Sequence, residues 1–314
     1  MEFFIDGAMS SNIVGYASCR TTDDGKQYPI LFGEIVACVG SLNKNDFYID
    51  DNRVEHHYVI AFPRKGEGLF YGQDCAHIED SIKKYGLIHD LGKGNIIFAP
   101  YPHSTESGKA SNTENLEKKG SFSQAKAAIL NEMRRLEKRL LEDVLEKQDA
   151  RVYIDGEFQE DNEKYHGRAV SICKLFSLPS LKQKLLDAGN LAKDIEKLKD
   201  GDNTCSYQWK GHEHYKNNWH TWFLKLRDNP IPDRDRIMSD LIQCTIESDK
   251  QPAEVEEMLK GWNRRLLELA FPTCYGLDKK RWRTHIYPIY LTELYCKSRL
   301  NNKKAIEHFI YGNK

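Results

Sequence analysis

Two short apolar runs in the sequence each end at an Asp-Gly pair. The first, FFIDG, ends at Asp6 and Gly7, and the second, VYIDG, ends at Asp155 and Gly156. A short apolar and aromatic run predicts a buried strand, and a following glycine lets the backbone turn sharply. We therefore expect each Asp at a strand tip, where a carboxylate suits Mg²⁺ or Mn²⁺. The alternative is two ordinary turn aspartates, because Asp-Gly is common in turns.

A metal site that acts on a phosphodiester needs at least a third carboxylate, because two ions stabilise the attacking and leaving oxygens together. A helix expected to begin at Ser121 or Ser123 and to reach about Lys147 offers four glutamates. At helical spacing only Glu137 falls within an apolar stripe, made by Met133, Leu140, Leu141 and Val144, while Glu132, Glu142 and Glu146 point away. A charged glutamate there needs compensation, either by a metal or by a salt bridge to Arg or Lys.

The composition limits the class of protein. The chain has 314 residues, 40% hydrophobic and 30% charged, which is typical of a globular protein with one large core or two modest ones. It contains no apolar run of about 18 residues and no signal-peptide pattern, so we expect a cytoplasmic protein that does not enter a membrane. Eight scattered cysteines without a C-x-x-C pair are expected to be reduced thiols.

The charge and the motifs narrow the function further. A net charge of −1 excludes a globally basic nucleic-acid binder and permits a local basic groove. A phosphotransferase would need a glycine-rich phosphate loop, and the sequence contains neither G-x-x-x-x-G-K-[ST] nor G-x-G-x-x-G.

The pattern along the chain predicts an α/β domain with a mixed sheet. The first half offers strand-like runs at 13–18, 30–40 and 56–62, which predict an antiparallel meander, followed by a helix at 74–85, a strand at 95–100 and a polar loop at 103–120. The second half, after the long helix and the strand at 151–155, offers strands at 169–176 and 222–227 and helices at 181–198 and 253–270. The run at 286–300 predicts a C-terminal helix, or a strand followed by a helix.

The order of these motifs resembles the NurA nucleases. The resemblance rests on Asp6-Gly7, Glu137, VYIDG with Asp155, HGRAVSICK with Gly167 and Lys174, WFLKLR, and HIYPIYLTELY near the end. It implies a ribonuclease H-like fold, a mixed β-sheet flanked by helices, with a helical and loop insertion in the C-terminal half. The domain would span 1–314, with a core at 1–102 and 121–180, a mobile loop at 103–120, and insertion and closing elements at 181–314.

The resemblance also implies an activity, a cofactor and partners. It implies a Mn²⁺- or Mg²⁺-dependent DNA nuclease with a two-metal site, which processes DNA ends or degrades foreign DNA as a homodimer docked on a HerA-type hexameric ATPase. Asp6, Glu137 and Asp155 would be the metal ligands, and Lys174 would neutralise or orient the scissile phosphate. Lys174 as a solvent-facing strand lysine is the alternative. The family's late catalytic histidine corresponds to His285, unless Tyr295 takes its place.

Two other functions remain open at this point. One is a ribonuclease H-like nuclease that acts on RNA or on RNA–DNA hybrids. The other is a catalytically weak scaffold that regulates an ATPase.

Two further features have more than one interpretation. The segment Cys205–Trp222 combines Cys and His with three tryptophans, and we expect a loop packed by its own tryptophans, with base stacking or a zinc site as alternatives. Glu34, between Gly33 and Ile35, is expected either near the metal site or paired with a structural arginine.

Overall fold

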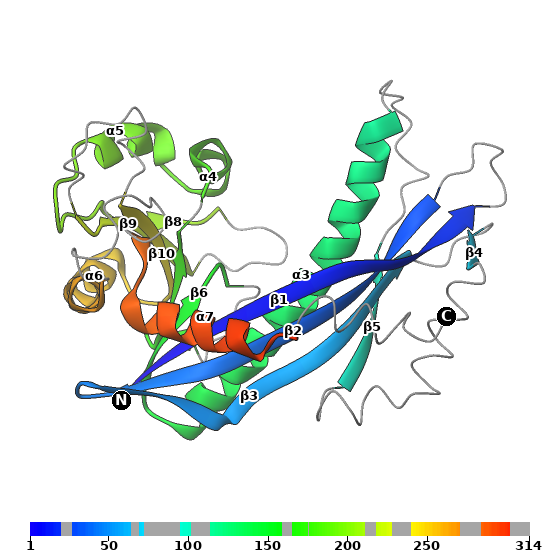
Figure 1. Ribbon diagram of the computed structural model, residues 1–314. Coiled ribbons are helices and arrows are strands. Elements are labelled where there is room, and N and C mark those ends of the chain that lie inside the picture. Colours follow the sequence, from blue (N-terminus) through cyan, green and yellow to red (C-terminus); the bar gives the residue numbers. More distant parts are fainter. Residues whose placement is uncertain are drawn as a thin grey trace. The chain divides into compact units, whose positions relative to one another are not determined.

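The computed structural model describes residues 1–19, 27–63, 69–71, 95–101, 114–158, 165–174, 176–210, 218–227, 240–270 and 284–301 (Figure 1). The strands are β1 (Glu2–Cys19), β2 (Gln27–Asn43), β3 (Asp46–Pro63), β4 (Leu69–Tyr71), β5 (Asn95–Tyr101), β6 (Arg151–Asp155), β7 (Ala169–Cys173), β8 (Tyr207–Gln208), β9 (Trp219–Lys225) and β10 (Leu241–Glu247). The helices are α3 (Glu114–Lys147), α4 (Leu178–Lys184), α5 (Leu191–Glu196), α6 (Pro252–Leu269) and α7 (Tyr287–Arg299), with a 3-10 turn, η2, at Ala188–Asn190.

The ten described strands form one sheet in the order β5-β3-β2-β1-β6-β7-β10-β9-β8, with β4 paired to β1. β1 and β6 are parallel, as are β6 and β7, whereas β10 is antiparallel to both β7 and β9. The predicted α/β class with a mixed, helix-flanked sheet is therefore confirmed.

The N-terminal strands are longer than the apolar runs predicted. The runs at 3–7 and 13–18 belong to one strand, β1, instead of two. The runs at 30–40 and 56–62 fall in β2 and β3, which a two-residue turn joins with Lys44 at a left-handed φ of 57°. So short a connection allows only an antiparallel pair, because parallel neighbours need a crossover. The meander is confirmed for this hairpin.

Helix boundaries differ from the predictions at two places. α3 begins at Glu114, so Ser121 and Ser123 lie inside the helix and the predicted cap there is wrong. The last seven residues of the predicted loop 103–120 are therefore helical, and the rest of that loop, like the predicted helix at 74–85, lies outside the described residues. The single helix predicted at 181–198 is instead α4, η2 and α5, interrupted at Asp187, whose φ is 52°.

In the C-terminal half, β6 confirms the strand predicted at 151–155, and β7 ends at Cys173, before the predicted end at 176. β9 covers most of the run at 222–227, and α6 and α7 confirm the last two helices. The sequence prediction omitted β10, LIQCTIE, although this run is apolar and rich in β-branched residues.

The chain divides into two compact units. The first comprises Met1–Asp6, Val39–Asp51 and Lys138–Leu294, and the second comprises Gly7–Cys38, Asn52–Glu137 and Tyr295–Lys314. Each unit thus combines N-terminal strand segments with later parts of the chain.

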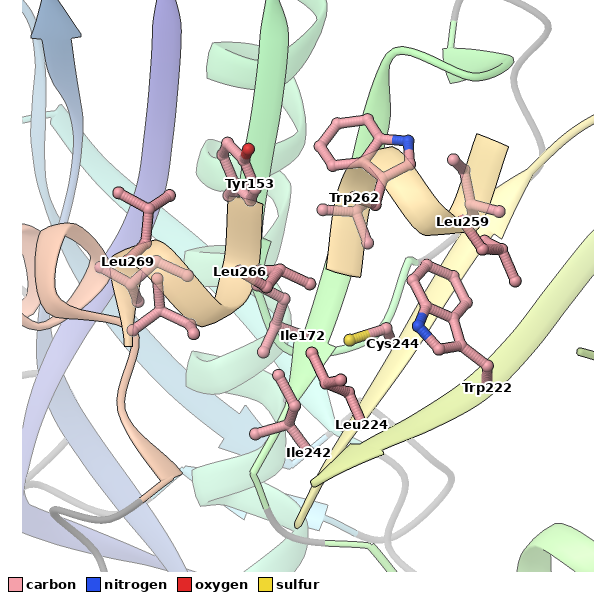
Figure 2. Close-up of a cluster of buried hydrophobic side chains, with 14 of the residues drawn as sticks. Tyr153, Ile172, Trp222, Leu224, Ile242, Cys244, Leu259, Trp262, Leu266 and Leu269 are labelled. Carbon is pink, nitrogen blue, oxygen red and sulfur yellow. The ribbon is translucent and has the colours of Figure 1, made fainter. Parts of the chain in front are cut away.

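The core of the first unit lies between its strands and α6. Figure 2 shows Leu259, Trp262, Leu266 and Leu269 of α6 over side chains of β7, β9 and β10. Phe4 of β1 and Tyr153 of β6 stack within this cluster, with ring centroids 4.9 Å apart, and Trp262 meets Tyr153 edge-on at 5.2 Å. Full burial of each such side chain contributes roughly 1.5–3 kcal/mol to folding.

The second unit brings α3 close to its sheet. A Cβ added to Gly33 of β2 would lie 2.7 Å from the Ile129 side chain of α3. Glycine at this position therefore lets a buried isoleucine contact the strand backbone directly. Among the described helices, none is long and apolar enough to cross a membrane.

Candidate metal-binding site on two parallel strands

Asp6 and Asp155 lie on adjacent parallel strands of the first unit. Asp155 ends β6 as predicted, whereas β1 continues to Cys19, so the strand tip predicted at Asp6 is wrong. β1 pairs with β6 in a register that matches Phe4 with Tyr153 and Ile5 with Ile154, and the next pair along would be Asp6 with Asp155. Side chains two residues apart on a strand share a face, so both aspartates follow the stacked Phe4–Tyr153 pair on the α6 side of the sheet. Neighbouring strands are about 4.8 Å apart.

Lys174 joins this face from the next strand. Asp155 pairs with Ile172 of β7, and Lys174 follows two residues later. The Lys174 Nζ donates to Asp155 Oδ2 at 3.0 Å, with side-chain exposures of 8% for the lysine and 26% for the aspartate. Lys174 is therefore not a solvent-facing lysine. It is a mostly covered cation bound to a carboxylate that solvent can reach.

A glycine shapes the backbone at this end of β6. Gly156 has a φ of 94°, and its N–H donates to the Ile172 carbonyl at 2.9 Å. Residues with a side chain rarely adopt this conformation, so glycine allows the chain to leave the strand directly after Asp155. The Asp-Gly pattern at this position therefore reflects a real change of chain direction.

Glu137 belongs to the second unit, where it packs against Gly7. It is 5% exposed and lies on α3, and its Oε1 would be 2.8 Å from a Cβ placed on Gly7. The helical pattern correctly predicts that Glu137 is buried. A Cβ placed on Gly7 would point to the face opposite to the Asp6 side chain, because successive strand residues alternate between faces.

The other glutamates of α3 differ from Glu137 in burial and in partners. Glu132 pairs with Arg135 at 2.5 Å, Glu142 pairs with Lys138 at 4.0 Å, and Glu146 is exposed. Among the described residues, no three His, Cys, Asp or Glu side chains are gathered closely enough to hold a metal ion.

His285 and Tyr295, the two candidates for the late catalytic residue, are in different surroundings. His285, before α7, is 3% exposed, and its ring meets Tyr290 edge-on at 5.4 Å. Tyr295, in the second unit, accepts a hydrogen bond from Arg299, whose guanidinium also lies over the tyrosine ring at 4.8 Å. His285 is thus the more buried of the two.

Tryptophans pack the described part of the segment Cys205–Trp222. Trp209 and Trp219 meet edge-on at 5.3 Å, and Trp209 Nε1 donates to Thr221 Oγ1 at 2.7 Å. Trp222 donates to Asn263 in the α6 core, and burial lowers the pKa of His220. These contacts favour the packed-loop interpretation, while residues 211–217, with two of the zinc-candidate histidines, lie outside the described residues.

Among the described residues, the partners of Glu34 in the second unit are a histidine and an asparagine, and none is an arginine. The Glu34 side chain is fully buried and accepts hydrogen bonds from His56 Nε2 at 2.7 Å, the Asn301 backbone N–H at 2.8 Å and Asn301 Nδ2 at 2.7 Å. Tyr58 contacts the same amide at 3.4 Å, and burial, followed by the charge of Glu34, raises its pKa to about 12. Three donors already bind Glu34, which indicates a structural carboxylate.

Comparison of the sequence with models of protein families and with curated proteins finds no match to either.

Proposed function

We propose that this protein is a divalent-metal-dependent DNA nuclease that hydrolyses phosphodiester bonds, either to process DNA ends or to degrade foreign DNA. The observation that carries the proposal is the arrangement on adjacent parallel strands, where Asp6 and Asp155 follow a stacked aromatic pair and Lys174 binds Asp155 at 3.0 Å. Two carboxylates and a cation on one face supply part of the group set that metal-dependent hydrolysis of a phosphodiester needs, and a third carboxylate would complete it.

The aspartates fit a hard divalent ion, because such ions take carboxylate oxygens. Mn²⁺ or Mg²⁺ bound there would supply an activated water and positive charge for the phosphate oxygens. Asp6 is 4% exposed and suits a rigid ligand, whereas the 26% exposure of the Asp155 side chain leaves it accessible. The resemblance to NurA nucleases makes Glu137 the third ligand. Glu137 packs against Gly7, on the face opposite to that of the preceding Asp6, so this assignment rests on the resemblance, and the Glu137→Gln variant tests it.

Lys174 has a separate role in this proposal. An ammonium group has three donors, so Lys174 can retain its hydrogen bond to Asp155 while it donates to a phosphate oxygen. Its position two residues beyond Ile172, the partner of Asp155, places its side chain on the same face as Asp155. We assign the late histidine of the site to His285. A homodimer and a HerA-type ATPase complete the proposal through the resemblance to NurA nucleases.

The test uses the full chain with end-labelled DNA and with RNA and RNA–DNA hybrids of the same sequence. We expect cleavage of DNA with Mn²⁺ or Mg²⁺ and none in excess EDTA. Preference for RNA or hybrids would favour the other ribonuclease H-like activity. Cleavage in excess EDTA, or no cleavage of any substrate by the protein alone and with a HerA-type ATPase, would reject the proposed mechanism.

A further inference from the structure

The C-terminal end of α7 is fixed to β2 by two contacts within the second unit. Cys296 of α7 places its Sγ 3.2 Å from the Sγ of Cys38, and Asn301, just beyond the helix, holds Glu34 through its backbone and side-chain N–H groups. Cys38 and Glu34 are four residues apart on β2 and therefore share a face. The thiol pair Cys38–Cys296 and the Asn301–Glu34 hydrogen bonds, which we call the clasp, therefore lie on the same face of β2.

The sulfur atoms of the two thiols are already close together. Both cysteines are reduced and 0% exposed. A disulfide bond is about 2.05 Å long, so the 3.2 Å separation would have to shorten by about 1.2 Å. Simple packing of two small thiols is the alternative, since buried cysteines often act as small hydrophobic residues.

We propose that Cys38 and Cys296 are a reversible oxidation site for hydroperoxides, which joins α7 covalently to β2. In the first step one thiol, as its thiolate, attacks one oxygen of hydrogen peroxide and becomes a sulfenic acid. The O–O bond breaks, and the other oxygen takes up the thiol proton and leaves as water. In the second step the other thiol attacks the sulfenic sulfur, forms the S–S bond and releases a second water. Two electrons pass from the two thiols to the peroxide, and a thiol reductant reverses the change.

Access to the buried thiols depends on the clasp. A small, neutral oxidant reaches them when the end of α7 opens locally, and the Asn301–Glu34 hydrogen bonds oppose that opening. Asn301→Ala removes the side-chain hydrogen bond to Glu34 and weakens the adjacent bond from the Asn301 backbone N–H. We expect this to destabilise the closed state by on the order of 1.4 kcal/mol, which makes the open state about tenfold more populated. Asn301→Ala should therefore form the disulfide about tenfold faster.

The disulfide would have a measurable effect on the fold. It joins residues separated by 258 positions in the sequence, and closure of a long loop restricts the unfolded chain strongly. We therefore expect the oxidised protein to have a higher thermal midpoint than the reduced protein. Amide exchange should also slow at the end of α7, because local opening there would be blocked.

The experiment treats the reduced full-length protein with hydrogen peroxide, alkylates the remaining thiols and maps disulfides by mass spectrometry of non-reduced peptides. We expect a cross-linked pair of peptides that contains Cys38 and Cys296, and its loss after treatment with dithiothreitol. Cys205→Ser is the matched control, because Cys205 is exposed and its removal should leave the cross-link unchanged. Cys296→Ser should prevent it.

Wild-type protein alone decides the proposal, even if the Cys296 variant does not fold. Oxidation of Cys205 while Cys38 and Cys296 remain alkylatable would overturn it. Disulfides that pair Cys38 or Cys296 mainly with other cysteines would also overturn it, since they would report unfolded protein. An unchanged oxidation rate in Asn301→Ala would reject the role of the clasp. None of these outcomes depends on nuclease activity.

Discussion

Asp155 and Glu34 are both strand carboxylates, but they occupy opposite kinds of surroundings. Asp155 ends β6, binds the ammonium of Lys174 and has a side chain that is 26% exposed. Glu34 lies in the middle of β2, is 0% exposed and accepts hydrogen bonds from His56 and Asn301. A buried carboxylate surrounded by protein donors stabilises a fold, whereas an accessible one at a strand end can also bind an ion from solution.

The largest expected effect separates these roles at Asp155. Asp155→Asn should reduce metal-dependent DNA cleavage by more than ~100-fold, since even partners of metal ligands affect activity by ~10–100-fold. The amide oxygen still accepts from Lys174, so we expect a folded protein that has lost at most about 1–3 kcal/mol. The measurements are cleavage rate and the rise in thermal midpoint on addition of Mn²⁺, which reports binding without catalysis.

Asp200→Asn is the control for this variant, because Asp200 is an exposed turn aspartate. It should leave both cleavage and the Mn²⁺-induced shift unchanged. If Asp155→Asn retains full activity, the difference between the two carboxylates does not concern metal binding.

Glu137→Gln tests whether the buried helix carboxylate resembles Asp155 or Glu34. If Glu137 is a metal ligand, the variant protein should lose DNA cleavage and Mn²⁺ affinity. Its metal-free form should be as stable as the wild type or slightly more stable. If Glu137 is instead one partner of a buried ion pair, the same change should cost roughly 3–5 kcal/mol of stability. Glu146→Gln, at an exposed position of the same helix, should be neutral. A destabilised Glu137 variant with unaltered Mn²⁺ affinity would remove the third ligand from the proposal.

At Glu34 we expect the reverse of the Asp155 result. Glu34→Gln keeps the size of the side chain, but its amide NH₂ cannot accept from Asn301 or His56. Stranding one or two buried donors should lower the free energy of unfolding by about 3 kcal/mol. Chemical denaturation measures this loss, and the Mn²⁺-induced stabilisation should persist. A Glu34 variant with normal stability but no Mn²⁺ response would place this carboxylate at the metal site after all.

The two carboxylates also differ in how much the sequence could predict. Asp155 was predicted at a strand tip from a local signal, a short apolar run followed by glycine, and β6 ends there, whereas the same signal at Asp6 failed because β1 continues through it. The partners of Glu34 are 22 and 267 positions away, so they depend on the β2–β3 register and on where α7 ends. No local pattern encodes that pairing, and neither expected environment of Glu34 included His56 or Asn301 for this reason.

Local signals also failed where cooperative structure overrides composition. Residues 114–120 were included in a polar loop because of their Gly, Ser and Asn neighbours, yet they form the first turns of α3. Adding turns to an existing helix costs much less than starting one, so a long helix can extend through a weak segment. The burial of Glu137, by contrast, was predictable because the apolar stripe of α3 repeats with the helical period.

Tyr58 provides the smallest and most direct measure of the Glu34 charge. Its pKa is raised to about 12, first by burial and then by Glu34, while the hydrogen bond from Asn301 opposes the rise. An unfolded tyrosine has a pKa of about 10, so its stabilising contribution is complete below pH ~10 and is lost as the pH rises towards ~12. The loss should reach up to about 2–3 kcal/mol and be absent in Tyr58→Phe.

Ultraviolet titration of the phenolate, by difference from Tyr58→Phe, measures the pKa of Tyr58 itself. Glu34→Gln should lower the pKa because a negative charge is removed, whereas Asn301→Ala should raise it because the ionised oxygen loses a donor. If both variants shift the pKa in the same direction, then general loosening of the site, and not the charge of Glu34, controls Tyr58.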